Sequence, residues 1–225
     1  MDVSKDPRLL VAEEAVRRLE RILAGWRLPW RLDKDKTASL VKEAKRIVYQ
    51  LRFSYTPPRI LAAMGEVERL REVAGELAGQ LLNPPPGAEL ALSQRLTLAE
   101  ARWAINILGG LAARLRLGDE PKPEYGVDVV GVEVTRVEEL GPNLYATRAT
   151  TGRIVLSIVT NIREIGEGQV RAAAILPPRL FGDVISEAMY SSGPIDRGLI
   201  GKRVPTSLLD TGLAGAVLAI VSGKS

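Results

Sequence analysis

The sequence predicts a two-domain protein in which an N-terminal all-α helical bundle is followed by a C-terminal all-β, five-stranded barrel. Three observations lead to this fold class. Apolar residues recur every three or four positions in the first half of the chain, they alternate with other residues in the second half, and a charged segment rich in proline and glycine separates the two. We therefore expect a helical domain over residues 1–118, a linker over 119–126 and a β domain with a C-terminal extension over 127–225.

The first three helices are expected over residues 9–23, 40–51 and 56–81. In each range the apolar positions fall on one side of a helix, and most charged positions fall on the other. Thr56 has the properties of a helix N-cap, and Pro57 suits the first helical position because its fixed φ already matches the helix. The third helix is therefore predicted to begin at these two residues.

A fourth helix is expected to begin at Thr97 and to end at Gly118. Thr97 and Glu100 have the spacing of a capping box, in which each side chain bonds to the backbone of the other. Gly109 and Gly110 lie in the middle of this helix, where each glycine costs roughly 1 kcal/mol of helix stability relative to alanine. Close approach of a neighbouring helix, or a kink, explains them better than a ligand contact.

Five short strands are expected after the linker, and glycine-containing turns separate them. Strands with an alternating pattern bury one face of a sheet, and five of them within about 65 residues favour a small barrel. The tail over 208–221 fits a short helix, and residues 216–221 fit an edge strand equally well. The expected strands cover residues 127–137, 144–150, 153–160, 169–176 and 184–191.

The composition excludes several classes of catalytic and metal site. The chain has no His and no Cys, so it contains no Ser-His-Asp triad, thiolate nucleophile, disulfide, or zinc site built from imidazole and thiolate ligands. We expect a protein that is not an enzyme and that carries no cofactor and no metal. An enzyme that uses the carboxylates Asp183 and Glu187 with a metal ion has little support in the sequence.

The excess positive charge lies in the first half of the chain. Residues 1–124 contain 21 basic and 17 acidic side chains, whereas residues 125–225 contain 10 of each. Within the first half, residues 31–59 hold eight cations and three acids, and aromatic residues interleave with the cations. Lys42, Lys45 and Arg46 are therefore candidate contacts for a polyanion, although cations on a helix also commonly form a plain solvated face.

One motif in the β domain points to a family. The segment LPPRLFGDVISEAM, residues 176–189, resembles the signature of the tRNA-binding OB-fold family, which includes C-terminal domains of methionyl-tRNA synthetases, synthetase cofactors and CsaA-type proteins. Weaker elements lie upstream, at Val130–Gly131 and in the Asn143-Leu144-Tyr145 sequence, and the resemblance covers residues 127–192. The matching residues of the main motif are Pro177, Pro178, Arg179, Gly182, Ser186, Glu187 and Met189.

The resemblance implies an OB-fold barrel with an RNA-binding surface. Such barrels place phosphates along a positive groove and stack bases on exposed aromatic rings. Arg179, on a turn held by two prolines, is expected to contact a phosphate, and Phe181 to stack on a base. Glu187 suits structural hydrogen bonding better than catalysis, and Tyr145 and Met189 suit the core. The candidate RNA-binding residues are Asn143, Arg148, Arg153, Arg179, Phe181, Ser186 and Glu187 in the barrel, together with Lys42, Lys45 and Arg46 in the helical domain.

The predicted function is non-catalytic binding of tRNA or another structured RNA, as an accessory to aminoacyl-tRNA synthetases. Members of the resembled family are often dimers, so a homodimer is expected. The alternative is a chaperone-like or scaffold module that uses the barrel to bind a protein partner, which the balanced charge of residues 125–225 favours. Charged residues open the chain and the longest apolar run, residues 212–221, is too short to span a bilayer, so we expect a cytoplasmic protein without a membrane partner. A composition of 23 Arg and 8 Lys without Cys is compatible with a thermophile.

Overall fold

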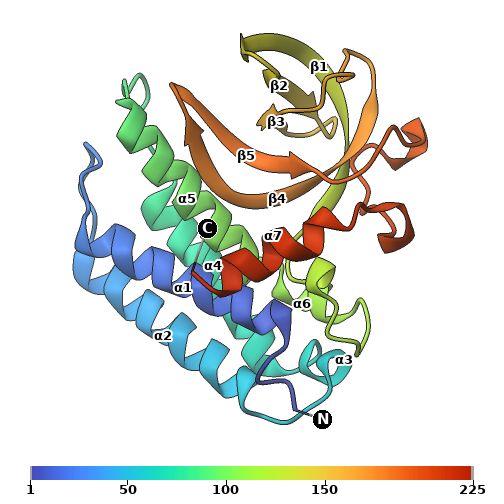
Figure 1. Ribbon diagram of the computed structural model, residues 1–225. Helices are drawn as coiled ribbons and strands as arrows, with labels where there is room; N and C mark the ends of the chain where they lie inside the picture. Colours follow the sequence, from blue (N-terminus) through green and yellow to red (C-terminus); the bar gives the residue numbers. More distant parts are fainter. Residues whose placement is uncertain (1, 224–225) are drawn as a thin grey trace. The chain divides into compact units, whose positions relative to one another are not determined.

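The computed structural model describes residues 2–223 and contains two compact units (Figure 1). The helical unit comprises Met1–Gly126 together with Val217–Ser225, and the β unit comprises Val127–Ala216. A helical region followed by a five-stranded antiparallel sheet confirms the predicted fold class. The end of the chain groups with the helical unit instead of remaining with the β domain.

Four long helices form the body of the helical unit. α1 (Pro7–Ala24) packs against α2 (Lys34–Arg52) and α5 (Leu92–Gly109), and α4 (Gly65–Leu81) packs against the same two helices. Each helix buries the apolar stripe that its sequence periodicity predicts, including Leu9, Ile47, Leu70 and Ile107. The shorter helices are α3 (Pro58–Leu61), α6 (Leu111–Leu115) and the 3-10 turn η1 (Pro123–Tyr125).

The expected helix over 56–81 is two helices, α3 and α4. Tyr55, before α3, adopts a left-handed conformation with φ of 56°, and Met64, before α4, is extended. The chain therefore changes direction before each of the two helices. Thr56 does not cap α3, because the residue before that helix is Pro57 and the Thr56 hydroxyl donates to the Ser54 carbonyl. The prediction missed this division because the apolar spacing continues across it.

The fourth expected helix also differs at both ends. α5 begins at Leu92, five residues before Thr97, whose hydroxyl bonds back to the Ser93 carbonyl inside the helix. α5 ends at Gly109, and α6 continues after Gly110. A Cβ added at Gly109 would lie 3.5 Å from the Ala74 Cβ, so α4 approaches α5 closely at this glycine. The predicted helix also breaks here, between Gly109 and Leu111.

The strands of the β unit have the order of an OB barrel. The sheet order is β3-β2-β1-β4-β5, all neighbours are antiparallel, and β3 lies against β5. Side chains join these last two strands: the Val159 N–H donates to Ser186 Oγ at 3.0 Å, and the Ser157 N–H donates to Glu187 Oε2 at 3.4 Å. We call this junction the seam. The strands are β1 (Val129–Gly141), β2 (Leu144–Thr150), β3 (Val155–Thr160), β4 (Val170–Phe181) and β5 (Val184–Tyr190).

The proline pair of the motif lies in a strand and not on a turn, which corrects the expected position of Arg179. Pro177 and Pro178 are part of β4, where the pairing register with β5 shifts between Ile175 and Arg179. Proline has no N–H to donate, so it fits a strand where the ladder is interrupted. The turn follows at Gly182, whose φ is 60°.

The segment after β5 returns to β1 before the last helix. Gly131 donates its N–H to the Lys202 carbonyl and accepts from the Gly201 N–H, both at 2.9 Å. This segment includes η2 (Arg197–Leu199) and η3 (Thr206–Leu208), and α7 (Gly212–Val221) follows. The apolar tail is therefore helical and not an edge strand. No helix among residues 2–223 has the length and apolar character needed to cross a bilayer.

Candidate nucleic-acid interface

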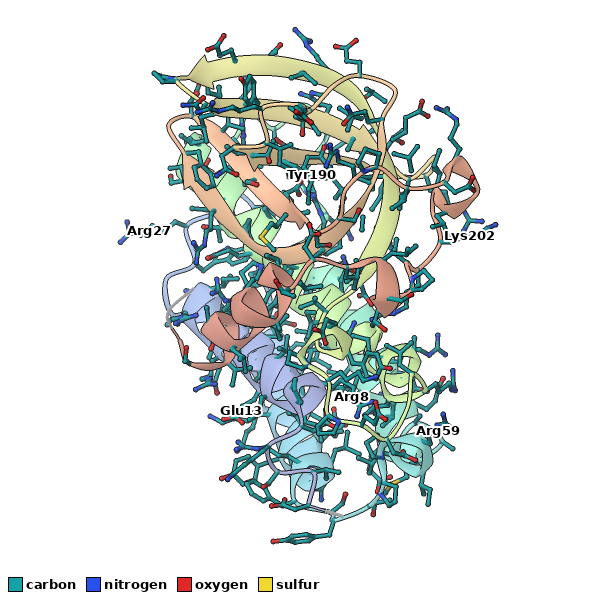
Figure 2. The ribbon with its side chains drawn as sticks, turned by 45° about the vertical axis from the view of Figure 1, so that its right-hand side comes forward. Arg8, Glu13, Arg27, Arg59, Tyr190 and Lys202 are labelled. Carbon is teal, nitrogen blue, oxygen red and sulfur yellow. The ribbon has the colours of Figure 1, made fainter. Side chains whose placement is uncertain are left out.

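Two hairpin tips carry candidate side chains of the β unit. Asn143 is exposed at the β1–β2 turn and has φ of 57°, a conformation that asparagine tolerates better than most residues. Phe181 is exposed at the β4–β5 turn, next to Gly182. Figures 1 and 2 both show these two tips on the same side of the β unit. The two tips thus display an exposed amide and an exposed aromatic ring.

Arg148 lies on the outer face of β2. Its neighbours Thr147 and Ala149 are buried, whereas Arg148 is exposed. It stands opposite Arg136 on β1 and Ser157 on β3. Arg136 pairs with Glu138, but Arg148 has no side-chain partner among residues 2–223, so its guanidinium is available to an anion.

The pairing of the strands places Arg179 at about the same height along the barrel as Arg148. Arg179 is paired with Ser186 on β5, Ser186 bonds to the Val159 N–H on β3, and Val159 is paired with Ala146 on β2. Ala146 precedes Arg148 by two residues. Three strand spacings of about 4.8 Å separate β4 from β2, so the two arginines lie on the order of 15 Å apart around the barrel.

Ser186 and Glu187 occupy the seam and not an open surface. Ser186 is 6% exposed, and its hydroxyl accepts from the Val159 N–H and donates to the Ala188 carbonyl. The Glu187 carboxylate accepts from the Ser157 N–H. The two residues that the motif offered as RNA contacts therefore hold β3 against β5, and Glu187 adds a negative charge near that junction.

The arginines of the barrel do not all gather on one face. Arg153 follows β2 on the loop to β3, about 20 Å along the strand from the Asn143 turn. Arg171 is 6% exposed and donates to Gln169 and to the Ser192 carbonyl. Arg171 is therefore a buried structural residue, and the candidate Arg153 lies apart from Arg148.

The interior of the barrel contains a polar pair, Thr147 and Tyr190, whose oxygens are 2.8 Å apart. The Thr147 hydroxyl donates to the Ile158 carbonyl, so the Tyr190 hydroxyl is the donor to Thr147. Burial raises the pKa of Tyr190, while the hydrogen bond to Thr147 and the nearby Arg171 oppose that rise. Figure 2 shows Tyr190 among the strands, and Tyr145 packs against the same core. Tyr190 therefore stabilises the barrel and is not a surface residue.

The three helical candidates are exposed on α2. Lys45 forms an ion pair with Glu20 at 2.8 Å, and Arg46 donates to the Gln50 side chain at 3.0 Å. Lys42 has no side-chain partner among the described residues. Two residues outside the predicted set also have exposed rings: Tyr49 lies on the same helix, and Phe53 is the residue that follows its last turn. The aromatic residues interleaved in the sequence were the signal for them.

Within residues 2–223, no group of three or more acidic side chains is placed to hold a metal ion. No curated protein sequence matches the chain. A family model described as an alpha helical domain matches residues 1–118, the range that contains α1 to α6. This match covers just over half of the 225 residues, and the chain therefore belongs to the alpha helical domain family.

Proposed function

We propose that the β unit binds folded RNA, and tRNA in particular, without catalysing a reaction. One observation carries the proposal: Arg148 and Arg179 are exposed without a side-chain partner among residues 2–223, and the two hairpin tips carry Asn143 and Phe181. OB barrels bind oligonucleotides over the β2–β3 face and the loops that join β1 to β2 and β4 to β5. The resemblance of residues 127–192 supports tRNA as the ligand.

Each side chain has a distinct part in this proposal. The guanidinium groups of Arg148 and Arg179 bind phosphates through paired N–H donors. Phe181 stacks on an unpaired base, and Asn143 hydrogen-bonds to a sugar or base edge. The same resemblance leads us to propose a cytoplasmic homodimer that assists aminoacyl-tRNA synthetases.

The proposal is tested by filter binding of bulk tRNA to the intact chain at two salt concentrations. The double variant Arg148→Ala, Arg179→Ala should bind about tenfold more weakly or worse, because a hydrogen bond to a charged group contributes roughly 1.5–3 kcal/mol. Its salt dependence should also be shallower, since each lost phosphate contact removes roughly 0.7–0.9 from the logarithmic slope.

Arg153→Ala is the matched control, because it removes an exposed cation from the same unit at the far end of β2. Its affinity for tRNA should remain close to that of the unmodified chain. Binding without a salt dependence, or an equal loss in the control, would contradict the proposed surface.

A second candidate is a module that binds a protein partner. Ile154 and Val155, on the β2–β3 loop and at the start of β3, are 54% and 57% exposed, and adjoining exposed apolar side chains are the feature from which contact patches are built. A stoichiometric protein complex from native cells that contains no RNA, and that Ile154→Asp disrupts, would favour this function over RNA binding.

A further inference from the structure

We infer that the outer face of α2 is a separate binding site for unpaired RNA nucleotides. Six side chains line one shallow depression there: Lys42, Lys45, Arg46, Tyr49, Gln50 and Phe53. We call them the α2 face. The inference extends the proposed function to the helical unit, and it does not require that the β unit binds RNA.

The spacing of these residues places them on one side of the helix. Counted from Lys42, the others follow at three, four, seven, eight and eleven positions, which is the repeat of a single helix face. The buried residues of α2, including Ala44, Ile47 and Leu51, alternate with them and point into the bundle. The core of the helical unit therefore does not explain why aromatic and basic residues occupy this side.

Two aromatic rings are displayed on the face. Tyr49 is 55% exposed and Phe53 is 41% exposed, with ring centroids 4.8 Å apart and planes inclined at 49°. The guanidinium of Arg52 lies 5.1 Å from the Phe53 centroid, so Tyr49 presents the more accessible ring. Exposed aromatic rings are the surface on which single-stranded nucleic acids stack their bases.

The cations of the face lie one to two turns before Tyr49. Lys42 has no side-chain partner among the described residues, and the hydrogen bond from Arg46 goes to the neutral amide of Gln50. Lys45 is held by Glu20, but both side chains of this pair are exposed, so an incoming phosphate competes for the lysine. One nucleotide thus stacks its base on Tyr49 while its phosphate contacts Lys42 or Arg46.

The neighbouring groove favours RNA over an acidic peptide as the occupant. This groove, between α1 and α2, has a volume of only about 190 Å³, and its charges balance because Arg17 and Lys45 line it together with Glu13 and Glu20. A peptide helix would have to bury its apolar anchors in this small volume, where no excess positive charge attracts its acidic residues. A nucleotide strand needs only the open rings and the cations, and the α2 face supplies both.

The test uses the intact chain and a fluorescently labelled oligouridine, with binding followed by anisotropy at low and moderate salt. Tyr49→Ala should weaken binding at least fivefold with little change in salt dependence, and Tyr49→Phe should restore it because the ring remains. The double variant Lys42→Ala, Arg46→Ala should weaken binding and also flatten the salt dependence.

Lys36→Ala is the matched control, since this exposed cation lies on α2 but on another side of the helix. It should bind oligouridine like the unmodified chain. The barrel variant Arg148→Ala, Arg179→Ala should also retain oligouridine binding, which separates this site from the proposed tRNA surface. Tryptophan fluorescence checks that each helical variant stays folded, because Trp26, Trp30 and Trp103 all lie in the helical unit.

Four results would overturn the inference. The first is oligouridine binding that Tyr49→Ala leaves unchanged, and the second is an equal loss in Lys36→Ala. The third is competition by polyglutamate as effective as that by unlabelled oligouridine, which would make the face a site for acidic polypeptides. Loss of oligouridine binding only in the barrel variant would place all RNA contacts on the β unit, so the proposed function would stand while this inference would fail.

Discussion

Single hydrogen-bonding side chains determine how the β unit holds together. Ser186 and Glu187 belong to a motif that suggested RNA contacts, yet both side chains bond to backbone N–H groups of β3. A buried N–H without a partner costs roughly 1–3 kcal/mol. These residue types therefore have a structural reason to stand at their positions, whether or not the barrel binds RNA.

Ser186→Ala should lower the free energy of unfolding of the β unit by about 1–3 kcal/mol, because the Val159 N–H loses its acceptor. Urea unfolding followed by far-ultraviolet circular dichroism measures the change. Ser157→Ala removes a hydroxyl from the facing strand but keeps the N–H that bonds to Glu187, so it serves as the control. Equal stability of the two variants would show that the seam does not depend on Ser186.

The stability of the β unit should fall at alkaline pH because of Tyr190. Burial raises the pKa of this phenol above its usual value of about 10. Below about pH 10 Tyr190 is neutral in the folded and the unfolded state, and its full contribution to the free energy of unfolding is present. At higher pH the unfolded chain loses the phenol proton first, so the folded state becomes less favourable relative to it. Tyr190→Phe should show a smaller decline above pH 10 in parallel urea titrations, and an unchanged decline would contradict this assignment.

Close approaches between backbone segments explain features of the strands that the side-chain pattern could not predict. Gly131 in β1 lies against the returning segment, where an added Cβ would be 2.2 Å from the Leu199 carbonyl oxygen. The sequence marked this glycine only through the family resemblance. The contact that requires it comes from a segment some 70 residues later in the chain, so local periodicity contains no information about it.

Gly131→Ala should destabilise the β unit by more than about 2 kcal/mol, since the backbone of residues 199–200 must move to admit the methyl group. Gly141→Ala in the same strand is the control, because nothing lies within 4 Å of its added Cβ. Thermal unfolding of both variants provides the measurement. A Gly131→Ala variant as stable as the control would mean that the returning segment is not held against β1.

The sequence predicted elements well where a local pattern determines them. The strand over 144–150 matches β2 at both ends, and the turn at Asn143 forms as expected. The break before α4 and the strand position of Pro177 were missed, because each depends on a single backbone conformation or a register shift. Arg8 gave no signal of burial, although it is fully buried against Asp6 and the Gly118 carbonyl. In the candidate site, the sequence offered the types of residue, but the exposure of each side chain depends on how the strands pair.

The last helix, α7, contains residues of both units. Val217 begins the C-terminal part of the helical unit and is fully buried, and its Cγ1 lies 3.1 Å from a Cβ built on Gly126. The next residue, Leu218, is 54% exposed on the same helix. The end of the chain thus contributes to the stability of the domain that the chain begins with.

Val217→Asp should destabilise the helical unit by at least about 3 kcal/mol, because it places an unpaired charge in a buried position. Leu218→Asp makes the same chemical change at the exposed neighbour and should cost little. Tryptophan fluorescence isolates the relevant transition, since all three tryptophans belong to the helical unit. Similar midpoints for the two variants would show that the tail does not stabilise this unit.

The seam has a consequence for association between chains. Four of the five strand contacts in the barrel are backbone ladders, whereas at the fifth the β5 side chains Ser186 and Glu187 accept hydrogen bonds from backbone N–H groups of β3. Local opening occurs first where the fewest bonds must break, so transient fluctuations of the β unit start at this junction. Each fluctuation uncovers the backbone groups of β3, and an uncovered strand edge is a template for a strand of a second molecule. Amide hydrogen exchange at Ser157 and Val159 therefore reports how often the barrel offers that template.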